Sequence, residues 1–435
     1  MKINLGATRI DERRTGLKRR RACVGGSILI LLIGLTCLGG KGVFAATLMT
    51  LHDFGGRGDG ENPQAGVVFD KAGNLYGTAA LGALNGNGVV YSLTPTAGGG
   101  APWDESVLHK FSGHPDGAVS VCFLTLTRSG QLFGTTEEGG DHDKGTVFAV
   151  RPPNNPGGPG AERVLYSFGS SPTDGVVPNA ELLRAGPGFY GVTREGGTNG
   201  EGTVFQLTPP DGGGNDWVET VLYSFAGPDG AFPSSGLTID DAGNLYGVTL
   251  IGGDNNLGAV YQLSPPVHQG DPWAETVIFS FSGPDGTLPS GTLQFDENGA
   301  LYGTTDGGGS LLEGTVFQLV QKEVGGSWDE SVLYSFSGGR DGGNPVAGVI
   351  INNKGQLFGT ASTGGSGGPD FGGVIFKLTA PLSQGDPWTE TVLHSFGGPD
   401  GFRSLSRLVP RGNGLYGTTS AGGLNGTGTV FVLTP

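Results

Sequence analysis

The hydrophobic and polar positions of the chain form short apolar runs separated by glycine-rich turns. Between residues 219 and 264 the runs ETVLYSF, GLTIDD, NLYGVT and GAVYQLS occur, with the turn DDAGN and the loop LIGGDNNL among them. Runs of this length, rich in Val, Phe, Tyr and Thr and bounded by Gly, Asp and Asn, are typical of β-strands and tight turns. No part of this unit has helical periodicity. The pattern predicts four short strands over residues 219–225, 236–241, 244–249 and 258–264.

The same four-strand unit recurs seven times. An aromatic residue followed by glycine marks each copy, at spacings of 56 to 58 residues: Tyr76, Phe133, Tyr190, Tyr246, Tyr302, Phe358 and Tyr416. Four antiparallel strands in about 56 residues make a propeller blade, whereas the coils of a β-solenoid are much shorter. We therefore predict an all-β, seven-bladed β-propeller with four antiparallel strands in each blade.

The order of the strands predicts how the ring closes. The first strand-like run, TLMTLHDF at residues 47–54, resembles the outer strands of the repeat. The last unit, over residues 405–434, has the inner, second and third strands. Residues 47–54 should therefore pair into the last blade, and blade 1 should use residues 65–111. Such closure leaves no unpaired ring junction. Because blades stack face to face, both surfaces of the middle strands should be buried.

The N-terminus predicts a targeting segment. Basic residues between Arg13 and Arg21 precede the apolar run SILILLIGLTCLGG, and small residues suited to cleavage follow at Ala45 and Ala46. We expect a signal peptide over residues 1–45 and a single propeller domain over residues 46–435. The apolar run is short for a membrane-spanning helix, which needs about 20 residues. An uncleaved signal anchor and a lipoprotein at Cys37 are alternatives, although GLTC lacks the small residue before the cysteine.

Charge and cysteine content limit the partners and the means of stabilisation. Without residues 1–45 the chain has 16 basic and 38 acidic side chains, a net charge of −22. Such a surface repels phosphate backbones and anionic lipid, so we expect no nucleic-acid partner and no membrane insertion after signal cleavage. Cys122 alone remains, as a small buried residue, so packing and strand pairing must stabilise the fold without a disulfide.

A family resemblance rests on the complete repeat. The pattern GNLYGTT..GG....GTVFQLTPP followed by W.ETVLYSF.GPDG resembles the GloVer tandem repeat of exported bacterial proteins, over essentially all of residues 47–435. The resemblance implies an extracytoplasmic, propeller-like repeat protein, often with a C-terminal surface anchor and with no defined enzymatic activity. This sequence ends at VFVLTP without a recognisable anchor, which favours secretion or periplasmic residence over surface attachment.

One aspartate followed by glycine recurs in every unit, between an outer strand and the next inner strand. The seven positions are Asp59, Asp116, Asp174, Asp229, Asp285, Asp341 and Asp400. A ring of carboxylates can gather hard cations such as Ca²⁺. The alternative is a repeated turn in which each Asp accepts hydrogen bonds from backbone N–H groups of its own loop. We favour the turn, because a seven-fold repeat follows the blade and not a single site.

The outer strands carry a W-x-E-[ST]-V motif. The five tryptophans, Trp103, Trp217, Trp273, Trp328 and Trp388, all belong to it. They can stack on sugars, but we expect them to cover blade edges. The glutamates of this strand position, Glu105, Glu162, Glu219, Glu275, Glu330 and Glu390, are expected to flank the strand start and face solvent. Identical repeats do not single out a catalytic carboxylate pair.

Residues that break the symmetry are better candidates for a ligand site. The second unit contains GHPDG at 113–117 and GGDHDKG at 139–145, in loops that lie on the same face of a propeller. Two histidines with carboxylates suit a divalent metal such as Zn²⁺. The candidate ligands are His114, Asp116, Asp141, His142 and Asp143. Exposed loops also carry such residues without binding metal, so we predict no obligatory cofactor, with Ca²⁺ or Zn²⁺ as the ions to consider.

The sequence leads to a function class without naming a ligand. HExxH, P-loop and dinucleotide motifs are absent from the sequence, and no unit has the strand-to-helix context of a nucleophile elbow. We expect an exported, monomeric propeller that acts in non-catalytic binding or scaffolding at the cell envelope or outside the cell, with carbohydrate or an envelope protein as partner. The binding surface is expected on the face of the GPDG and GG loops, or in the central channel there. A secreted polysaccharide-active enzyme with its site in the central channel, and a purely structural envelope protein, are the alternatives.

Overall fold

The computed structural model describes residues 46–435 except 56–57, 84, 99, 154–157, 213, 215–216, 269, 324, 367–371 and 384. The predicted signal peptide over residues 1–45 lies outside the described residues. Within the described part, all regular structure is β-strand. No helix among the described residues has the length and hydropathy needed to cross a bilayer.

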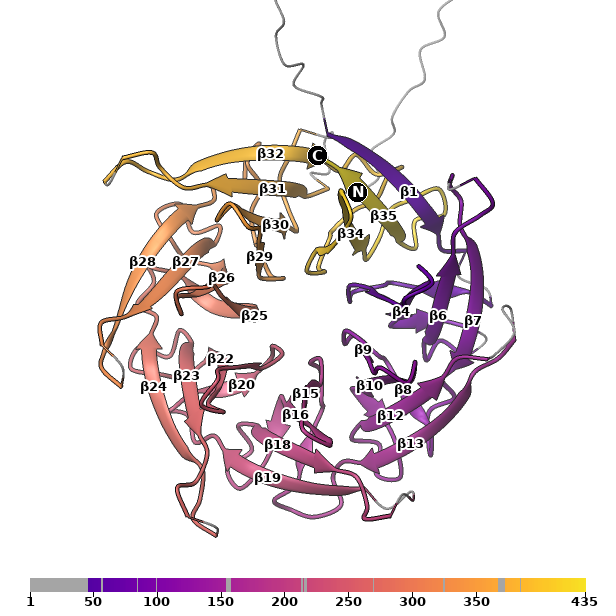
Figure 1. The fold of residues 1–435 in the computed structure, drawn as a ribbon, viewed down its shortest axis with the longest axis horizontal. Coiled ribbons are helices and arrows are strands. Elements are labelled where there is room, and N and C mark those ends of the chain that lie inside the picture. The colour runs from indigo at the N-terminus through magenta and orange to yellow at the C-terminus, as the bar shows by residue number, and fades with distance from the viewer. Residues whose placement is uncertain are drawn as a thin grey trace, which may run out of the picture. The chain divides into compact units, whose positions relative to one another are not determined.

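The strands form seven antiparallel sheets arranged around a ring (Figure 1). From the inner to the outer strand, blade 1 contains β3 (Val68–Phe69), β4 (Leu75–Ala79), β6 (Val89–Thr94) and β7 (Asp104–Lys110); blade 2 contains β9 (Thr125–Leu126), β10 (Leu132–Thr136), β12 (Thr146–Arg151) and β13 (Ala161–Ser167). Blade 3 contains β15 (Leu183–Ala185), β16 (Gly188–Thr193), β18 (Thr203–Thr208) and β19 (Val218–Ser224).

The remaining blades follow the same order. Blade 4 contains β20 (Ala231–Pro233) and β21 (Thr238–Ile239), which both pair with β22 (Leu245–Ile251), then β23 (Ala259–Ser264) and β24 (Ala274–Ser280). Blade 5 contains β25 (Thr287–Phe295), β26 (Leu301–Gly307), β27 (Thr315–Gln321) and β28 (Trp328–Ser335). Blade 6 contains β29 (Val349–Ile351), β30 (Leu357–Ala361), β31 (Val374–Thr379) and β32 (Thr389–Ser395).

Blade 7 combines the two ends of the described chain. It contains β33 (Val409–Arg411), β34 (Gly414–Thr419) and β35 (Thr429–Thr434), and its outer strand is β1 (Thr47–Asp53). Strand β1 runs antiparallel to β35 along almost its whole length. The predicted seven-bladed propeller, closed by the N-terminal strand, is confirmed.

Short two-stranded sheets join the loops on one face of blades 1 to 3. They pair the loop that enters each blade with the loop between its second and third strands: β2 (Gly60–Glu61) with β5 (Leu81–Gly82), β8 (Gly117–Ala118) with β11 (Glu138–Gly139), and β14 (Gly175–Val176) with β17 (Glu195–Gly196). The two kinds of loop therefore lie on the same face, as their positions in the repeat predict.

Packing between blades explains the middle strands. Every residue of β4, β10 and β30 is buried, so these strands lack an alternation of apolar and polar side chains. At each of the seven junctions, an aromatic ring just after an outer strand packs edge-to-face on an aromatic ring in the third strand of the following blade. Phe225 and Tyr261 form one such pair, with ring centroids 5.0 Å apart. This repeated contact buries aromatic surface at every junction between blades. Cys122 is a buried free thiol, so it forms no disulfide that could stabilise the described part of the chain.

The aromatic–glycine pair of the repeat follows from the same packing. In blade 4, a Cβ placed on Gly247 would lie 2.4 Å from the hydroxyl oxygen of Tyr261, which is closer than carbon and oxygen can approach without displacement. Gly191 and Gly303 stand in the same relation to Phe205 and Phe317. Glycine is therefore needed because the aromatic ring of the third strand lies directly over the second strand.

Candidate functional site

The centre of the ring is narrow. Residues from all seven blades line a central cavity of about 120 Å³, and most of them are small or neutral. Glu181 is the carboxylate of this lining. Its two oxygens accept hydrogen bonds from the Thr292 hydroxyl (2.9 Å) and the Arg407 guanidinium (3.2 Å). The carboxylate therefore ties blades 3, 5 and 7 together across the channel.

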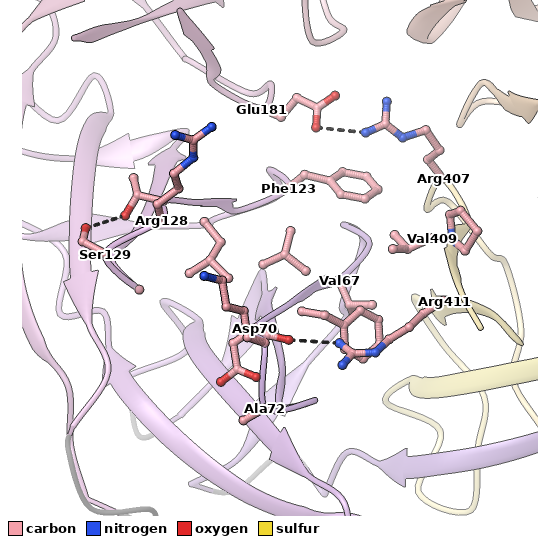
Figure 2. Close-up of a pocket in the computed structure, with 17 residues that line it drawn as sticks. Val67, Asp70, Ala72, Phe123, Arg128, Ser129, Glu181, Arg407, Val409 and Arg411 are labelled. Atoms are coloured by element: carbon pink, nitrogen blue, oxygen red, sulfur yellow. Dashed lines mark hydrogen bonds and ion pairs between the residues drawn. The ribbon is translucent and has the colours of Figure 1, made fainter. Parts of the chain in front are cut away.

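A wider cavity of about 880 Å³ opens at one mouth of this channel (Figure 2). It is formed mainly by blades 1, 2 and 7, at the turns that connect their inner and second strands, and blade 3 contributes Glu181. Four cationic side chains line it, Lys71, Arg128, Arg407 and Arg411, together with two acidic ones, Asp70 and Glu181. Val67, Phe69, Phe123, Leu126 and Val409 contribute apolar surface. The cavity walls are thus cationic and partly apolar, in a chain whose residues 46–435 have a net charge of −22.

Aromatic rings position two of the guanidinium groups. The guanidinium of Arg411 lies 4.5 Å from the ring centroid of Phe69 and donates a hydrogen bond to the backbone carbonyl of Asp70 (3.1 Å). The guanidinium of Arg407 lies 5.1 Å from the ring centroid of Phe123. In Figure 2 these two arginines lie on one side of the cavity and Arg128 on the other. Cation–π contacts hold planar donors at the cavity wall, where an anion can approach.

The two neighbouring acidic groups offset only part of this charge, because four cationic side chains stand against two carboxylates. Asp70 accepts hydrogen bonds from the backbone amides of Gly73 and Asn74 and from the Tyr76 hydroxyl. Burial alone would raise the pKa of Asp70, but these hydrogen bonds outweigh it and lower the pKa. Glu181 is paired with Arg407. Lys71 and Arg128 are exposed at the rim.

This cavity lies away from the face that the sequence analysis favoured for binding. The GPDG loops lead into the inner strands, whereas the cavity lies at the turns that follow those strands. The sequence signal for the cavity is weak, because Arg407 and Glu181 are separated by 226 residues. Only the closed ring brings them together.

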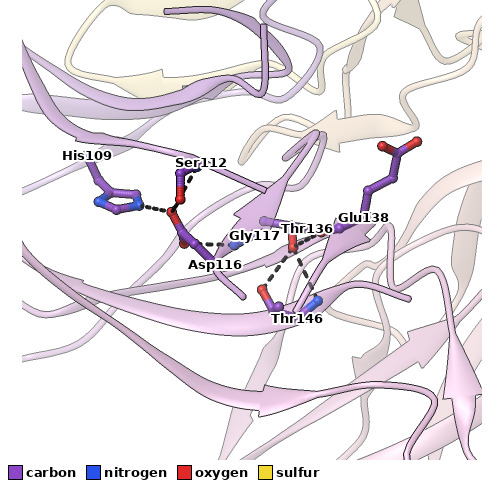
Figure 3. Close-up of polar contacts among 7 residues, drawn as sticks. All are labelled: His109, Ser112, Asp116, Gly117, Thr136, Glu138 and Thr146. Carbon is purple, nitrogen blue, oxygen red and sulfur yellow. Dashed lines mark hydrogen bonds and ion pairs between the residues drawn. The ribbon is translucent and has the colours of Figure 1, made fainter. Parts of the chain in front are cut away.

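The recurrent aspartates all lie in the loops between blades. Each accepts at least one hydrogen bond from a backbone amide of its own loop, as seen for Asp59, Asp116, Asp174, Asp229, Asp285, Asp341 and Asp400. In six of the seven loops, a His or Tyr near the end of the preceding outer strand also contacts the carboxylate. Figure 3 shows this arrangement for Asp116, which contacts His109, Ser112 and Gly117.

The glutamates of the W-x-E-[ST]-V position differ from expectation. They are half-buried, and one carboxylate oxygen of each is buried without a hydrogen-bond partner among the described residues: Glu105, Glu162, Glu219, Glu275, Glu330 and Glu390. The expectation that they face solvent was wrong. The reason is that the start of each outer strand overlaps the preceding blade, as the hydrogen bond from the amide of Gly160 to the carbonyl of Leu108 shows (2.7 Å).

This overlap places each glutamate beside the recurrent aspartate of the preceding loop. Burial raises the pKa of Glu219 to about 8, and the charge of Asp174 adds to the shift. Burial likewise raises the pKa of Glu162 to about 7; His109 opposes this shift and Asp116 adds to it. At Asp116, burial raises the pKa, but the hydrogen bonds from His109 and Gly117 outweigh it and lower the pKa.

The tryptophans pack against the preceding blade. Trp217 lies 6.2 Å from Phe133 of the preceding blade and 6.0 Å from Phe189 of its own blade, measured between ring centroids. Trp273 contacts Tyr190, also in the preceding blade, in an edge-to-face arrangement at 5.9 Å. All five tryptophans are half-buried. Their apolar surface thus contributes to blade packing.

The candidate metal ligands of the second unit are partly brought together. Asp116, Asp141 and His142 line one cavity of about 740 Å³. His114 is instead held by a hydrogen bond between its Nδ1 and the carbonyl oxygen of Gly140 (3.0 Å). Asp143 is an exposed loop residue with a positive φ of 53°.

Sequence analysis missed two residues beside Asp116. The donor atoms of His109, Asp116 and Glu162 all lie within 4.8 Å of one another. A signal for His109 was present: the equivalent position of the other units holds Tyr166, Tyr223, Phe279 and Tyr334, with histidine only at His52 and His394. Comparing the repeats position by position would have identified it.

The fold and these sites define a class: a seven-bladed β-propeller assembled from tandem repeats, with candidate ligand sites at the channel mouth and between blades. The model of the Gloeobacter/Verrucomicrobia repeat matches residues 41–188, 103–317 and 269–435. The chain belongs to this repeat family, which confirms the resemblance seen in its sequence. No curated protein matches the chain.

Solved structures share the fold at low sequence identity. An ancestral GH74 enzyme has a TM-score of 0.53 at 11% identity, with 86% of this chain and 48% of that chain covered. A candidate 6-phosphogluconolactonase from Bacteroides uniformis has a TM-score of 0.50 at 13% identity, with 81% and 89% covered. The extracellular domain of a candidate hybrid two-component system from B. thetaiotaomicron has a TM-score of 0.50 at 13% identity, with 89% and 42% covered. These likenesses show the propeller fold alone.

Proposed function

We propose that the protein is an exported, non-catalytic binding propeller that holds an acidic carbohydrate at the mouth of its channel. The observation that carries this proposal is the cavity lined by Lys71, Arg128, Arg407 and Arg411. Guanidinium groups bind carboxylates through two parallel hydrogen bonds, and apolar surface beside them suits the face of a sugar ring. A uronic acid residue combines both features.

Electrostatics favour this location for an anionic ligand. A strongly acidic protein repels anions over most of its surface. A local group of cationic side chains therefore determines where an anionic ligand can bind. Among the described residues, the hydrogen bonds of Arg407 and Arg411 each use a single nitrogen. A guanidinium has five N–H donors, so further donors remain for a ligand.

Export is supported by the composition of the N-terminal segment, which is basic and then apolar as in a signal peptide. The likeness to an extracellular domain is in keeping with this location. An extracytoplasmic protein would meet acidic polysaccharides of the envelope or of the surroundings.

Binding has more support than catalysis in the channel. An enzyme that hydrolysed polysaccharide by the usual mechanism would need carboxyl groups in the channel that can exchange protons with the substrate. Among the described residues of the narrow channel, that group is Glu181, and both of its oxygens are engaged by Thr292 and Arg407.

Calorimetric titration with a polyuronate oligosaccharide and with a neutral oligosaccharide of the same length tests the proposal. We expect the acidic ligand to bind and its affinity to fall with added salt. Lys71→Ala and Arg128→Ala should each weaken binding by about tenfold, since a hydrogen bond to a charged group contributes about 1.5–3 kcal/mol. Both side chains are exposed, so folding should be unaffected.

Lys354→Ala is the matched control. Lys354 is an exposed lysine in the corresponding turn of blade 6, outside the lining of this cavity. Its removal changes the net charge equally and should leave affinity nearly unchanged. Equal binding of neutral and acidic ligands, or equal losses in all three variants, would contradict the proposal. Binding of neither ligand would favour a structural envelope protein.

A further inference from the structure

A second site lies at the junction of blades 1 and 2, apart from the channel mouth. His109 is near the end of β7, Asp116 is in the loop that follows, and Glu162 is near the start of β13. One donor atom from each lies within 4.8 Å of the other two. We propose that these three side chains bind a divalent transition-metal ion, with Zn²⁺ as the best fit.

The chemistry of the three donors suits this ion. Zn²⁺ takes imidazole nitrogen and carboxylate oxygen ligands at about 2.0–2.2 Å, and three protein ligands leave a fourth position open. Ligands around a tetrahedral ion at that distance are about 3.3 Å apart. Small side-chain rotations bring the three donors from their present spacing to that geometry. Ca²⁺ prefers oxygen ligands alone and fits less well.

Contacts in the structure already orient the ligands. The Nε2 atom of His109 lies 3.0 Å from Oδ2 of Asp116. The backbone amide of Gly117 donates to the other oxygen of the same carboxylate (2.7 Å). The imidazole ring packs edge-to-face on Phe111, with ring centroids 4.9 Å apart. The first contact joins two of the proposed ligands, and bonds to the ion would replace it. The other two lie outside the ligand set, where such contacts fix the direction of metal ligands and strengthen binding.

Glu162 supplies a donor without a competing partner. Its Oε1 atom is buried and has no hydrogen-bond partner among the described residues. The equivalent glutamates of the other junctions share this property, so it does not single out blade 2. A buried carboxylate oxygen without a partner costs free energy, which a metal ion at this position would recover.

The histidine distinguishes this junction from most of its equivalents. At three of them the hydroxyl of Tyr166, Tyr223 or Tyr334 donates a hydrogen bond to the aspartate. A phenol with a pKa near 10 is a poor ligand at neutral pH, whereas a neutral imidazole is a good one. The repeat thus supplies two carboxylates at every such junction, and His109 adds the nitrogen.

The site is accessible to ions. Asp116 and Glu162 line a cavity of about 740 Å³ that also contains Asp141 and His142. The cavity offers an ion a route of entry, and Asp141 and His142 offer further donor atoms beside the three ligands. The net charge of −22 over residues 46–435 raises the local concentration of cations at the surface.

Calorimetric titration with Zn²⁺ tests the proposal. The protein is expressed from the full-length gene without a tag, purified in the form that the cell produces, and freed of metal with a chelator. The junction of blades 7 and 1 carries the same residue types, His52, Asp59 and Glu105, but among the described residues only His109, Asp116 and Glu162 bring such donors within 4.8 Å of one another. We therefore expect one strong Zn²⁺ site per chain. His109→Tyr should weaken it by about 100-fold or more, since removing a ligand exceeds the 10–100-fold effect of outer contacts. Tyrosine occupies the equivalent position of three other blades, so this variant should fold.

A gain of binding complements the loss. Tyr223→His places an imidazole beside Asp229 and Glu275, the equivalent carboxylates at the junction of blades 3 and 4. We expect this variant to bind a second Zn²⁺ ion. Weak or absent Zn²⁺ binding by the unaltered protein, or unchanged affinity in His109→Tyr, would overturn the proposal. Equal affinities for Ca²⁺ and Zn²⁺ would also overturn it, because they indicate a site of oxygen ligands alone.

Discussion

Thr47 lies opposite Thr434 in the antiparallel ladder between β1 and β35, so both ends of the described chain belong to one blade. The closure rests on a packed interface as well as on backbone hydrogen bonds. Leu51 and Phe54 are fully buried at 0% exposure, and Phe54 packs on Tyr91 of blade 1 with ring centroids 5.0 Å apart. The N-terminal strand therefore belongs to the ring and does not merely cover it.

The first prediction concerns this strand. Deleting residues 47–54 removes the outer strand of blade 7 and should lower the melting temperature strongly. Leu51→Ala should cost about 2–5 kcal/mol of unfolding free energy, because it leaves a cavity in the core. Met49→Ala, in the same strand but 36% exposed, is the control and should cost far less. Denaturant unfolding measures all three. An unchanged transition after the deletion would contradict closure by this strand.

The second prediction concerns the glycine of the repeat. Gly247→Ala forces its new methyl group against the Tyr261 ring, so the ring or the strand must move, at a cost of about 1–3 kcal/mol. Gly100→Ala is the control, because no heavy atom lies within 4 Å of its Cβ position. Thermal unfolding of the two variants should differ clearly. Equal stability would show that the close approach of Tyr261 to Gly247 is absent in solution.

The third prediction concerns two buried tyrosines. The hydroxyl groups of Tyr91 and Tyr261 are buried and lack a hydrogen-bond partner among the described residues. The equivalent residue of the other five blades is phenylalanine. Tyr261→Phe removes an unsatisfied polar group and should stabilise the fold by about 1 kcal/mol or more. Tyr223→Phe is the control: its hydroxyl donates to Asp229, so its loss should destabilise. A lower melting temperature for Tyr261→Phe would contradict this assignment.

The fourth prediction concerns pH. Burial raises the pKa of Glu219 to about 8, and that of Glu275, Glu330 and Glu390 to about 7, from an ordinary value of 4.5. A raised pKa means that the folded state holds these protons more tightly than the unfolded state. The resulting stability is fully present below about pH 4.5 and is lost as the pH rises through 7 to 8.

We therefore expect a lower melting temperature at about pH 8 than at about pH 5, in buffers of equal ionic strength that contain a chelator. At the acid end, the lowered pKa values of Asp59 and Asp400 act in the opposite direction, since their contribution is lost as the pH falls below about 4. Replacing the four glutamates by glutamine, which resembles the protonated form, should flatten the decline above pH 5. The same decline in this variant would show that other groups cause it.

The fold was predictable because its signal is local and repeated. Each blade carries its own strands and turns, and the aromatic–glycine pair sets a regular period along the chain. The outer-strand type of residues 47–54 was enough to predict ring closure. A repeat protein is stabilised mainly by contacts within a unit and with its neighbours, so one correctly assigned unit describes the others.

The candidate sites were less predictable because they depend on contacts between units. Glu162 was assigned to solvent, since its own strand gives no sign that the preceding blade overlaps it. His109 was overlooked because its signal emerges only when the repeats are compared position by position. Asp116 was recognised, and its contact with His109 is local, seven residues away along the chain. Its closeness to Glu162 arises only from the packing of adjacent blades.

By itself, the sequence determined the number of blades, the strand order and the way the ring closes, because these follow from the period and phase of short-range patterns. Only the tertiary structure decided which side chains meet. Arg407 reaches Glu181 across the ring, and Glu162 lies beside Asp116 between two blades. The physical reason is that the tilt between adjacent blades and the width of the ring set these distances, and neither quantity is encoded in the spacing of residues along one repeat.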